Sequence, residues 1–330
     1  MRFGKLTTLA GLCTAAALAL SACGATNEGA GPDVDREIDD AFVDCVPGEG
    51  SADFTALPDD DNQNIDVVSF NGWIDTEIVA HLTKHTLEEH GYNVTVHYLD
   101  AAPGFAGVAN GDLDIVASSQ LPTTHAAYME QFGDDLDSLG CWYDNATNTI
   151  AVNDASPAQT IADLADMADE YDNRIVGIEP GAGLMRATQN QVIPAYGLEG
   201  LQLVSSSTPA MLAELKRAVD SGDNIAVTMW HPHWAYDQFP LRDLEDPEGA
   251  FGDPEALFTF TRTGFGEENP KATQLLRNLV IPNELFTDLA NLMSSEEGYA
   301  GENPEDAIDE WLERNPEFLE GWTKGTLATE

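Results

Sequence analysis

The sequence predicts an α/β fold in which strands and helices alternate and build mostly parallel sheets with helices on both faces. Short apolar runs rich in β-branched residues alternate with longer amphipathic runs from residue 64 onward. The chain has 330 residues, 43% of them hydrophobic, which is enough to bury one large core or two lobes. The sequence contains no repeat of fixed period, so a solenoid or a propeller is not expected.

The first part of the predicted fold starts with an apolar strand, NIDVVSFNGW, followed by an amphipathic helix. The helix has apolar residues at Ile78, Val79, Leu82 and Leu87, which is the spacing of one helical face. The run NVTVHYL alternates between apolar and polar residues, as a half-buried strand does. Strands are predicted at residues 64–73, 93–99, 113–119 and 147–153, and helices at 74–92, 104–112 and 123–133.

The second part continues the alternation. Strands are predicted at residues 174–180, 201–206 and 224–230, and helices at 160–171, 182–197 and 208–222. After the run LFTFTRTGF the chain is predicted to be mostly helical. Because these C-terminal helices must return to cover the first sheet, we expect one lobe from residues 64–153 plus 256–330 and a second lobe from residues 154–255.

The N-terminus has the features of an export signal. Arg2 and Lys5 precede the apolar run LTTLAGLCTAAALALSA, so we assign residues 1–22 to a signal peptide and exclude them from the fold. The run ends in LSAC, which resembles the lipobox of bacterial lipoproteins, where Cys23 would be acylated and become the mature N-terminus. Residues 23–63 are rich in glycine and acidic residues, and we expect a flexible, lipid-anchored tether.

Charge and cysteine content limit the possible partners and the compartment. The chain has 58 Asp and Glu residues against 14 Lys and Arg, a surface that would repel nucleic acid and anionic lipid headgroups. Once the signal peptide with Cys13 is removed and Cys23 is lipidated, Cys45 and Cys141 remain. An even pair in an oxidising compartment predicts a disulfide between the tether and the domain. A metal site is less expected, because neither cysteine has a Cys or His neighbour in the sequence.

Candidate binding residues come directly after predicted strands, where ligands bind in α/β sheets. Trp73 ends the first strand, QLPTTH follows the third, PGAGLM follows RIVGIE, and WHPHW follows NIAVTM. Taken singly, each has an ordinary explanation as a core tryptophan, a tight turn or a surface histidine. Taken together, they offer two indole faces, a glycine-lined helix start suited to an anion, and the donor His125.

Longer motifs resemble those of the glycine betaine and proline betaine substrate-binding proteins of ABC importers. The motifs are GWID (72–75), LPTTH (121–125), VGIEPGAGLMRAT (176–188), SSSTPAMLAELKRAV (205–219), TMWHPHWAY (228–236), LEDPEGAFG (244–252), TRTGF (261–265) and AIDEWLERNPEFLEGW (307–322). The resemblance implies a type II periplasmic-binding-protein-like fold whose two lobes, each a mostly parallel sheet flanked by helices, close on a small zwitterion. It also implies an extracytoplasmic, lipid-anchored receptor without cofactor or enzymatic activity, whose protein partner is an ABC permease.

The resemblance further implies roles for individual residues. In this family, tryptophans around the cleft form a box that holds a quaternary ammonium by cation–π attraction, and Trp73 and Trp230 match two of the box positions. The backbone amides of Gly183 and Leu184, together with the ring of His125, match the groups that hold the ligand carboxylate.

Gln120 departs from the family pattern, because it stands in QLP where the family has WLP. A carboxamide offers no aromatic face, but it donates and accepts hydrogen bonds. Phe105, Tyr143 and His231 are candidates to complete the box. The substitution also leaves open a related solute that carries an N–H or a hydroxyl, such as an ectoine-, proline- or carnitine-like molecule.

Two other classes of function rank behind a solute receptor. His81 and His85 have the i,i+4 spacing that can bind a metal on a helix, and His231 and His233 flank a proline. The sequence has no HExxH motif, no evident third ligand and no GxSxG motif. A metal-binding receptor and an exported enzyme such as a hydrolase are therefore less expected, and we assign no metal ligands and no catalytic residues.

Overall fold

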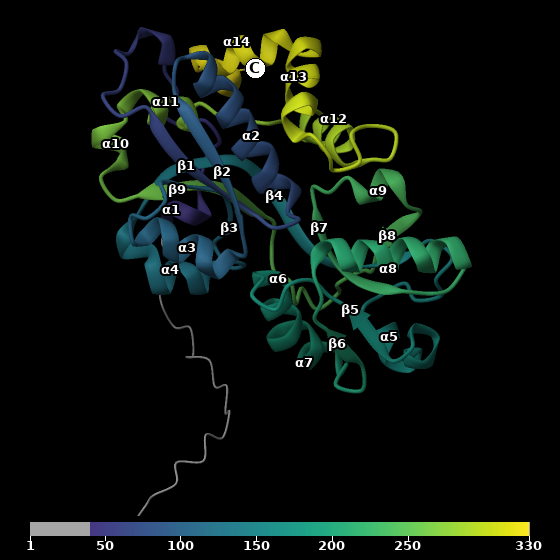
Figure 1. Ribbon diagram of the computed structural model, residues 1–330. Helices are drawn as coiled ribbons and strands as arrows, with labels where there is room; N and C mark the ends of the chain where they lie inside the picture. Colours follow the sequence, from purple (N-terminus) through teal and green to yellow (C-terminus); the bar gives the residue numbers. More distant parts are fainter. Residues whose placement is uncertain (1–39, 330) are drawn as a thin grey trace, which may run out of the picture. The chain divides into compact units, whose positions relative to one another are not determined.

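The computed structural model describes residues 40–329 and confirms the α/β class (Figure 1). Within these residues, nine strands form a continuous mixed sheet in the order β2-β1-β3-β9-β4-β7-β5-β6, with β8 paired to β4. The strands are β1 (Asn64–Phe70), β2 (Asn93–Leu99), β3 (Ile115–Leu121), β4 (Leu136–Asn153), β5 (Arg174–Val176), β6 (Gln202–Val204), β7 (Ala226–His231), β8 (Leu241–Asp243) and β9 (Glu255–Arg262).

Helices cover both faces of the sheet (Figure 1). They are α1 (Asp40–Val43), α2 (Ile74–Glu89), α3 (Ala101–Ala109), α4 (Ala126–Phe132), α5 (Asp163–Asp166), α6 (Gly183–Ala187), α7 (Ile193–Tyr196), α8 (Thr208–Ser221), α9 (Ala235–Gln238), α10 (Phe265–Glu268), α11 (Pro270–Arg277), α12 (Asn283–Ser294), α13 (Pro304–Arg314) and α14 (Pro316–Lys324). A π-helical turn, Thr188–Val192, joins α6 to α7, so this stretch is continuously helical as predicted.

The parallel strands β1, β2 and β3 follow the predicted strand–helix alternation. β1 pairs in parallel with β2 along its whole length and with β3 near its centre. Alternate residues of β1 enter different hydrophobic clusters: Val67 packs with the apolar face of α2, whereas Val68 packs on the side of Phe105 in α3. This two-residue period buries both faces of the strand and explains its nearly continuous apolar sequence.

The long strand β4 makes the sheet mixed rather than mostly parallel. Its first part pairs antiparallel with β9, and its last part, from Thr147 onward, pairs antiparallel with β7 and β8. Parallel pairing is confined to the β1–β3 and β5–β7 groups. Antiparallel neighbours need no crossover helix, so the chain passes directly between the two groups along β4.

The C-terminal helices return to the first group of strands, next to α2 (Figure 1). Helix α11 contacts both β4 and α2, and helices α12 and α13 contact α2. Trp311 of α13 and Trp322 of α14 are completely buried in the same cluster as the apolar face of α2. The position of these helices agrees with the reason for the lobe boundaries given above, and the boundaries themselves remain a prediction.

The described part of the predicted tether packs against the domain. Phe54 is fully buried, and the Asp60 carboxylate accepts hydrogen bonds from the backbone N–H groups of Lys271 (2.9 Å) and Ala272 (3.0 Å) at the start of α11. A disulfide joins Cys45 to Cys141 in β4. The predicted tether is therefore too long at its C-terminal end. Phe54 and Asp60 hold this stretch against the domain although the residues around them have the composition of a flexible segment. Residues 1–22 and Cys23 lie outside the described part of the chain.

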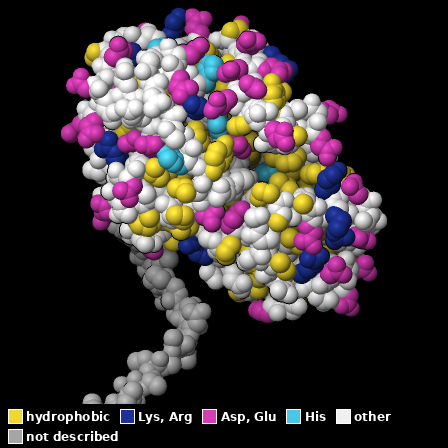
Figure 2. Space-filling model, viewed as in Figure 1, with side chains coloured by type: hydrophobic (Ala, Val, Ile, Leu, Met, Phe, Trp, Pro, Cys, Tyr) yellow, Lys and Arg dark blue, Asp and Glu magenta, His cyan; other side chains and the backbone are white. Residues whose placement is uncertain are grey.

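Among the charged side chains on the viewed surface, acidic ones are more frequent than basic ones (Figure 2). This distribution follows from the formal net charge of −44. Within residues 40–329, no helix combines the length and the hydrophobicity that crossing a membrane requires.

Candidate functional site

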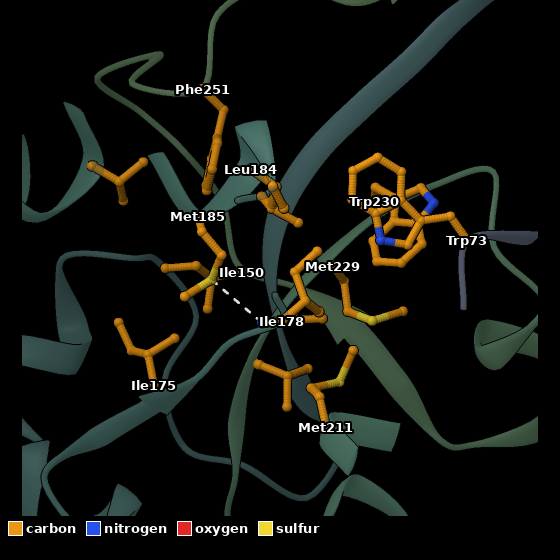
Figure 3. Packing of buried hydrophobic residues seen from close by; sticks show 14 of the residues in the cluster. Trp73, Ile150, Ile175, Ile178, Leu184, Met185, Met211, Met229, Trp230 and Phe251 are labelled. Atoms are coloured by element: carbon orange, nitrogen blue, oxygen red, sulfur yellow. Dashed lines mark hydrogen bonds between the residues drawn. The ribbon is translucent and has the colours of Figure 1, made fainter. Parts of the chain in front are cut away.

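A pocket at the ends of β1, β3 and β7 brings together most of the residues that the sequence singles out. The predicted residues that line it are Trp73, Gln120, His125, Leu184, Trp230 and His231. The space between its walls, counted together with adjoining open solvent, is about 460 Å³. The two indoles overlap in the view of Figure 3, with Leu184 beside them.

Trp73 reaches the pocket from a tight turn between β1 and α2. Gly72 has φ +76°, which a residue with a side chain rarely adopts, and the Thr76 hydroxyl accepts a hydrogen bond from the Phe70 N–H (2.8 Å) across the turn. The Trp73 indole is 9% exposed and stacks on the His125 ring at 5.6 Å with an interplanar angle of 6°. Its Nε1–H donates to Glu179 Oε2 at 3.3 Å. The ring is therefore held on two sides and has little freedom to rotate.

Trp230 lies near the end of β7, just before the cis peptide bond between His231 and Pro232. The proline stops the strand, since it has no N–H for the sheet. The Trp230 indole is 8% exposed and meets the His233 ring edge-on at 4.5 Å. His233 in turn stacks on Trp234 at 5.6 Å, so Trp234 supports the site from behind.

His125 is a neutral hydrogen-bond donor at the pocket wall. It is 4% exposed, and burial, with a smaller effect from the Arg186 charge, lowers its pKa to about 3. Its Nδ1 accepts a hydrogen bond from the Gln120 backbone N–H (2.9 Å). Because Nδ1 accepts, the proton of the neutral ring lies on Nε2, which is free to donate to a ligand.

The loop after β3 is organised by the buried carboxylate of Glu255, which is 5% exposed. Its Oε1 accepts from the backbone N–H groups of Thr123 and Thr124, the second at 3.0 Å. Its Oε2 accepts from the Thr124 hydroxyl and from Gln120 Nε2, the latter at 3.0 Å. These four hydrogen bonds fix the loop that contains the cis bond between Leu121 and Pro122. No local sequence pattern pointed to Glu255, which lies 135 residues from Gln120.

Gly183 is required by close packing at the start of α6. A Cβ atom on this residue would lie 2.0 Å from the carbonyl oxygen of Thr124, which no side chain tolerates. This contact brings the loop after β3 and the helix start together, and Leu184 then reaches the pocket. Gly183 itself is buried beside the pocket and is not part of its lining.

The three candidates to replace the missing box tryptophan lie in different places. His231 lines the pocket, but its Nε2 is 2.7 Å from Asp243 Oδ2 and its ring stacks on Tyr236. Phe105 is completely buried behind His125, with ring centroids 6.0 Å apart, and does not line the pocket. Tyr143 is also outside the lining, and its hydroxyl donates to Asn283 Oδ1 at 3.2 Å. The structure therefore does not support Phe105 and Tyr143 as walls of the box.

The pocket also contains residues that the sequence analysis missed. They are Asp75, Thr124, Ala146, Asn148, Ile178, Ala182, Pro232 and Leu257. Asp75 is 9% exposed in the first turn of α2, where the helix dipole favours a negative charge, and burial raises its pKa. The motif GWID could have revealed Asp75, which follows Trp73 by two residues. Asn148 and Leu257 had no local signal, because β4 and β9 reach the pocket only through the order of strands in the sheet.

The histidines proposed as possible metal ligands have other contacts. On α2, His81 Nε2 lies 2.7 Å from the Tyr98 hydroxyl, and His85 Nδ1 lies 2.7 Å from Asp309 Oδ1. In the part of the chain from residue 40 to 329, no cluster of three or more His, Cys, Asp or Glu residues is arranged to hold a metal ion. Burial lowers the pKa of three histidines, to about 4 for His81 and about 3 for His125 and His233.

Comparisons with solved structures agree with this fold. Lactococcal OpuAC, in its closed-liganded conformation complexed with glycine betaine, is 30% identical with a TM-score of 0.73, over 80% of this chain and 100% of that one. An ABC-transporter choline-binding protein in complex with choline is 26% identical with a TM-score of 0.72, over 81% of this chain and 96% of that one. The fold is therefore that of the type II periplasmic binding proteins, as the sequence predicts.

Comparisons of sequence identify the family. The glycine betaine/carnitine transport binding protein GbuC of Listeria monocytogenes is 38% identical over 162 residues, which are 48% of this chain and 52% of that protein. The match thus spans about half of the length of this curated relative. The family model described as the substrate binding domain of ABC-type glycine betaine transport systems matches residues 63–314, which is most of the chain. The chain therefore belongs to the family of substrate-binding domains of ABC-type glycine betaine transport systems.

Proposed function

We propose that this protein is the extracytoplasmic receptor of an ABC importer and captures a small cationic or zwitterionic solute of the glycine betaine type in the pocket. The observation that carries the proposal is the meeting of Trp73, from the turn after β1, and Trp230, from the end of β7, at one pocket. Indole faces attract a cation with roughly 0.5–2 kcal/mol each once water is excluded. The relatives named above are named for glycine betaine, carnitine and choline, which all carry a quaternary ammonium group.

The charges around the pocket support one orientation of the solute. Asp75 provides a carboxylate near the tryptophans, and the helix start at Leu184 together with Nε2–H of His125 provides donors for an anionic group. Arg186 adds a positive charge close enough to His125 to affect its pKa. In this orientation the cation lies against Trp73 and Trp230, and a ligand carboxylate lies near His125 and the amides of Gly183 and Leu184.

The cellular context is part of the same proposal. The motif LSAC after a signal-like segment supports acylation of Cys23, which would anchor the domain to the outer face of the cell membrane. The partner would be the permease of an ABC importer, as for other substrate-binding domains of this family. Two lobes, from residues 64–153 plus 256–330 and from 154–255, would close on the solute.

Calorimetric titration of the purified protein with glycine betaine, proline betaine, choline, carnitine and ectoine tests the proposal. We expect at least one of these solutes to bind with one-to-one stoichiometry, with unchanged affinity in the presence of a chelator, and to be recovered chemically unchanged. Failure of all five to bind would overturn the proposal. Loss of binding on addition of chelator would favour a metal-dependent receptor, and conversion of the solute would favour an enzyme.

A further inference from the structure

Gln120, the residue that replaces a box tryptophan, has its side-chain amide held in one orientation. It lies in β3, is 7% exposed and borders the pocket. Its Nε2 donates to Glu255 Oε2 at 3.0 Å. A carboxylate oxygen accepts hydrogen bonds, so the nitrogen end of the amide faces Glu255 and the oxygen end is turned away from it.

Glu255 cannot easily release this amide, because its own position is fixed from three other directions. Its two oxygens also accept from the backbone N–H groups of Thr123 and Thr124 and from the Thr124 hydroxyl. Among residues 40–329, Gln120 Oε1 has no hydrogen-bond partner, and it is not one of the fully buried polar atoms. The exposed surface of Gln120 borders the pocket, so its free oxygen is offered there as an acceptor.

A second amide is arranged in the same way. Asn148 Nδ2 donates to the Thr124 hydroxyl oxygen at 2.7 Å, while that hydroxyl donates to Glu255. The nitrogen ends of both amides are therefore linked to the Glu255 network, which leaves Asn148 Oδ1 as another acceptor at the pocket wall. Together with the Asp75 carboxylate, the side chains near the indoles are rich in acceptors.

We propose that Gln120, positioned by Glu255, makes the pocket selective for cationic solutes that carry a hydrogen-bond donor, either an N–H or a hydroxyl, over fully methylated betaines. This inference rests on the proposed function, since it concerns the solute that the same pocket binds. A solute with a donor satisfies the Gln120 oxygen when the pocket closes. A fully methylated ammonium covers that oxygen with methyl groups, so the acceptor loses water and gains no hydrogen bond.

Two pairs of solutes test the inference and distinguish the two kinds of donor. N,N-dimethylglycine differs from glycine betaine by one methyl group replaced by an N–H, and choline differs from its methyl ether by a hydroxyl. In titrations of the intact protein, the donor-bearing member of at least one pair should bind at least roughly tenfold more tightly than the other member. This ratio corresponds to one hydrogen bond that is gained or lost away from water. The pair that responds identifies the donor as N–H or hydroxyl.

Two variants separate the amide oxygen from general effects on the pocket. Gln120→Leu removes the acceptor, and we expect the affinity ratio of the responding pair to fall to about one. Glu255→Gln keeps the side-chain size and the acceptor for the Thr123 and Thr124 N–H groups, but it places an NH₂ opposite Gln120. The Gln120 amide must then turn its own NH₂ to the pocket, so the ratio should again fall while the methylated solutes still bind.

Three results would overturn the inference, and the third would also overturn the proposed function. Equal or tighter binding of the fully methylated member in both pairs would exclude selectivity for a donor. A ratio that persists in both Gln120→Leu and Glu255→Gln, with thermal unfolding confirming that the variants fold, would assign the selectivity to other groups. Absence of binding by all four solutes would overturn the proposed function itself and this inference with it.

Discussion

Replacing Trp73 by alanine removes one wall of the pocket and should weaken solute binding by about 1–3 kcal/mol, or one to two decades in Kd. The value combines the lost cation–π attraction of one indole face with the lost apolar contact of that face. Stability should also fall, because the ring is 9% exposed and packs on Phe70 at 5.2 Å and on His125 at 5.6 Å. Since one side of the ring borders the pocket, we expect about 2–3 kcal/mol, below the cost of a fully enclosed tryptophan.

Two further substitutions separate the contributions of the indole. Trp73→Phe keeps an aromatic face but removes the N–H that donates to Glu179 Oε2 at 3.3 Å. Loss of this hydrogen bond should lower the free energy of unfolding by about 0.5–1.5 kcal/mol. Trp311→Phe is the matched control: Trp311 is completely buried, donates to Asp288 Oδ2 at 2.9 Å and is not part of the pocket. The control should lower stability and leave Kd unchanged.

Calorimetric titration with the best-binding solute measures Kd, and denaturant unfolding measures stability in the same set of variants. Trp230→Ala should behave like Trp73→Ala, since the two rings line the same pocket. Unchanged affinity in both alanine variants would refute the cation-box mechanism, even if both proteins are destabilised. Weaker binding by the Trp311→Phe control would show that the alanine variants lose affinity because they are destabilised, and not because the pocket has lost an indole.

Four other perturbations test the site and the fold around it. Gly183→Ala places a Cβ 2.0 Å from the Thr124 carbonyl oxygen, so stability should fall by about 1–3 kcal/mol or more. Thermal unfolding measures this loss, and unchanged stability would contradict the close approach. The three buried histidines have folded pKa values below their ordinary value of 6.5, so the unfolded state binds more protons and stability should fall as the pH drops from 6.5 toward 4. His81→Gln should reduce the slope of unfolding free energy against pH by at most about 1.4 kcal/mol per pH unit, and an unchanged slope would show that this histidine does not titrate as described. Reduction of the disulfide between Cys45 and Cys141, which spans 96 residues, should lower stability by about 2–5 kcal/mol, whereas two free thiols in the unreduced, denatured protein would exclude the bond.

The local pattern of the sequence accounts for most elements and for the ends of the strands. The apolar runs locate β1, β2 and β7 to within a few residues, and the 3.6-residue period locates α2 and α8. The prediction missed most of β4, because its first part contains glycine and polar residues instead of an apolar run. It also assigned the whole of residues 23–63 to a tether, since composition averages over a segment and does not reveal that Phe54 is buried.

The sequence by itself determined which residues stand at the ends of strands, and hence that Trp73, His125, Leu184 and Trp230 could share a site. These residues lie next to signals that depend only on chain neighbours: strand ends, a glycine turn and a helix start. Tertiary structure alone decided the orientation of the Gln120 side-chain amide, because the pairing of β3 with β9 brings Glu255 to it from 135 residues away. Strand order places such partners side by side, and the local pattern along the chain does not reveal which distant strands become neighbours.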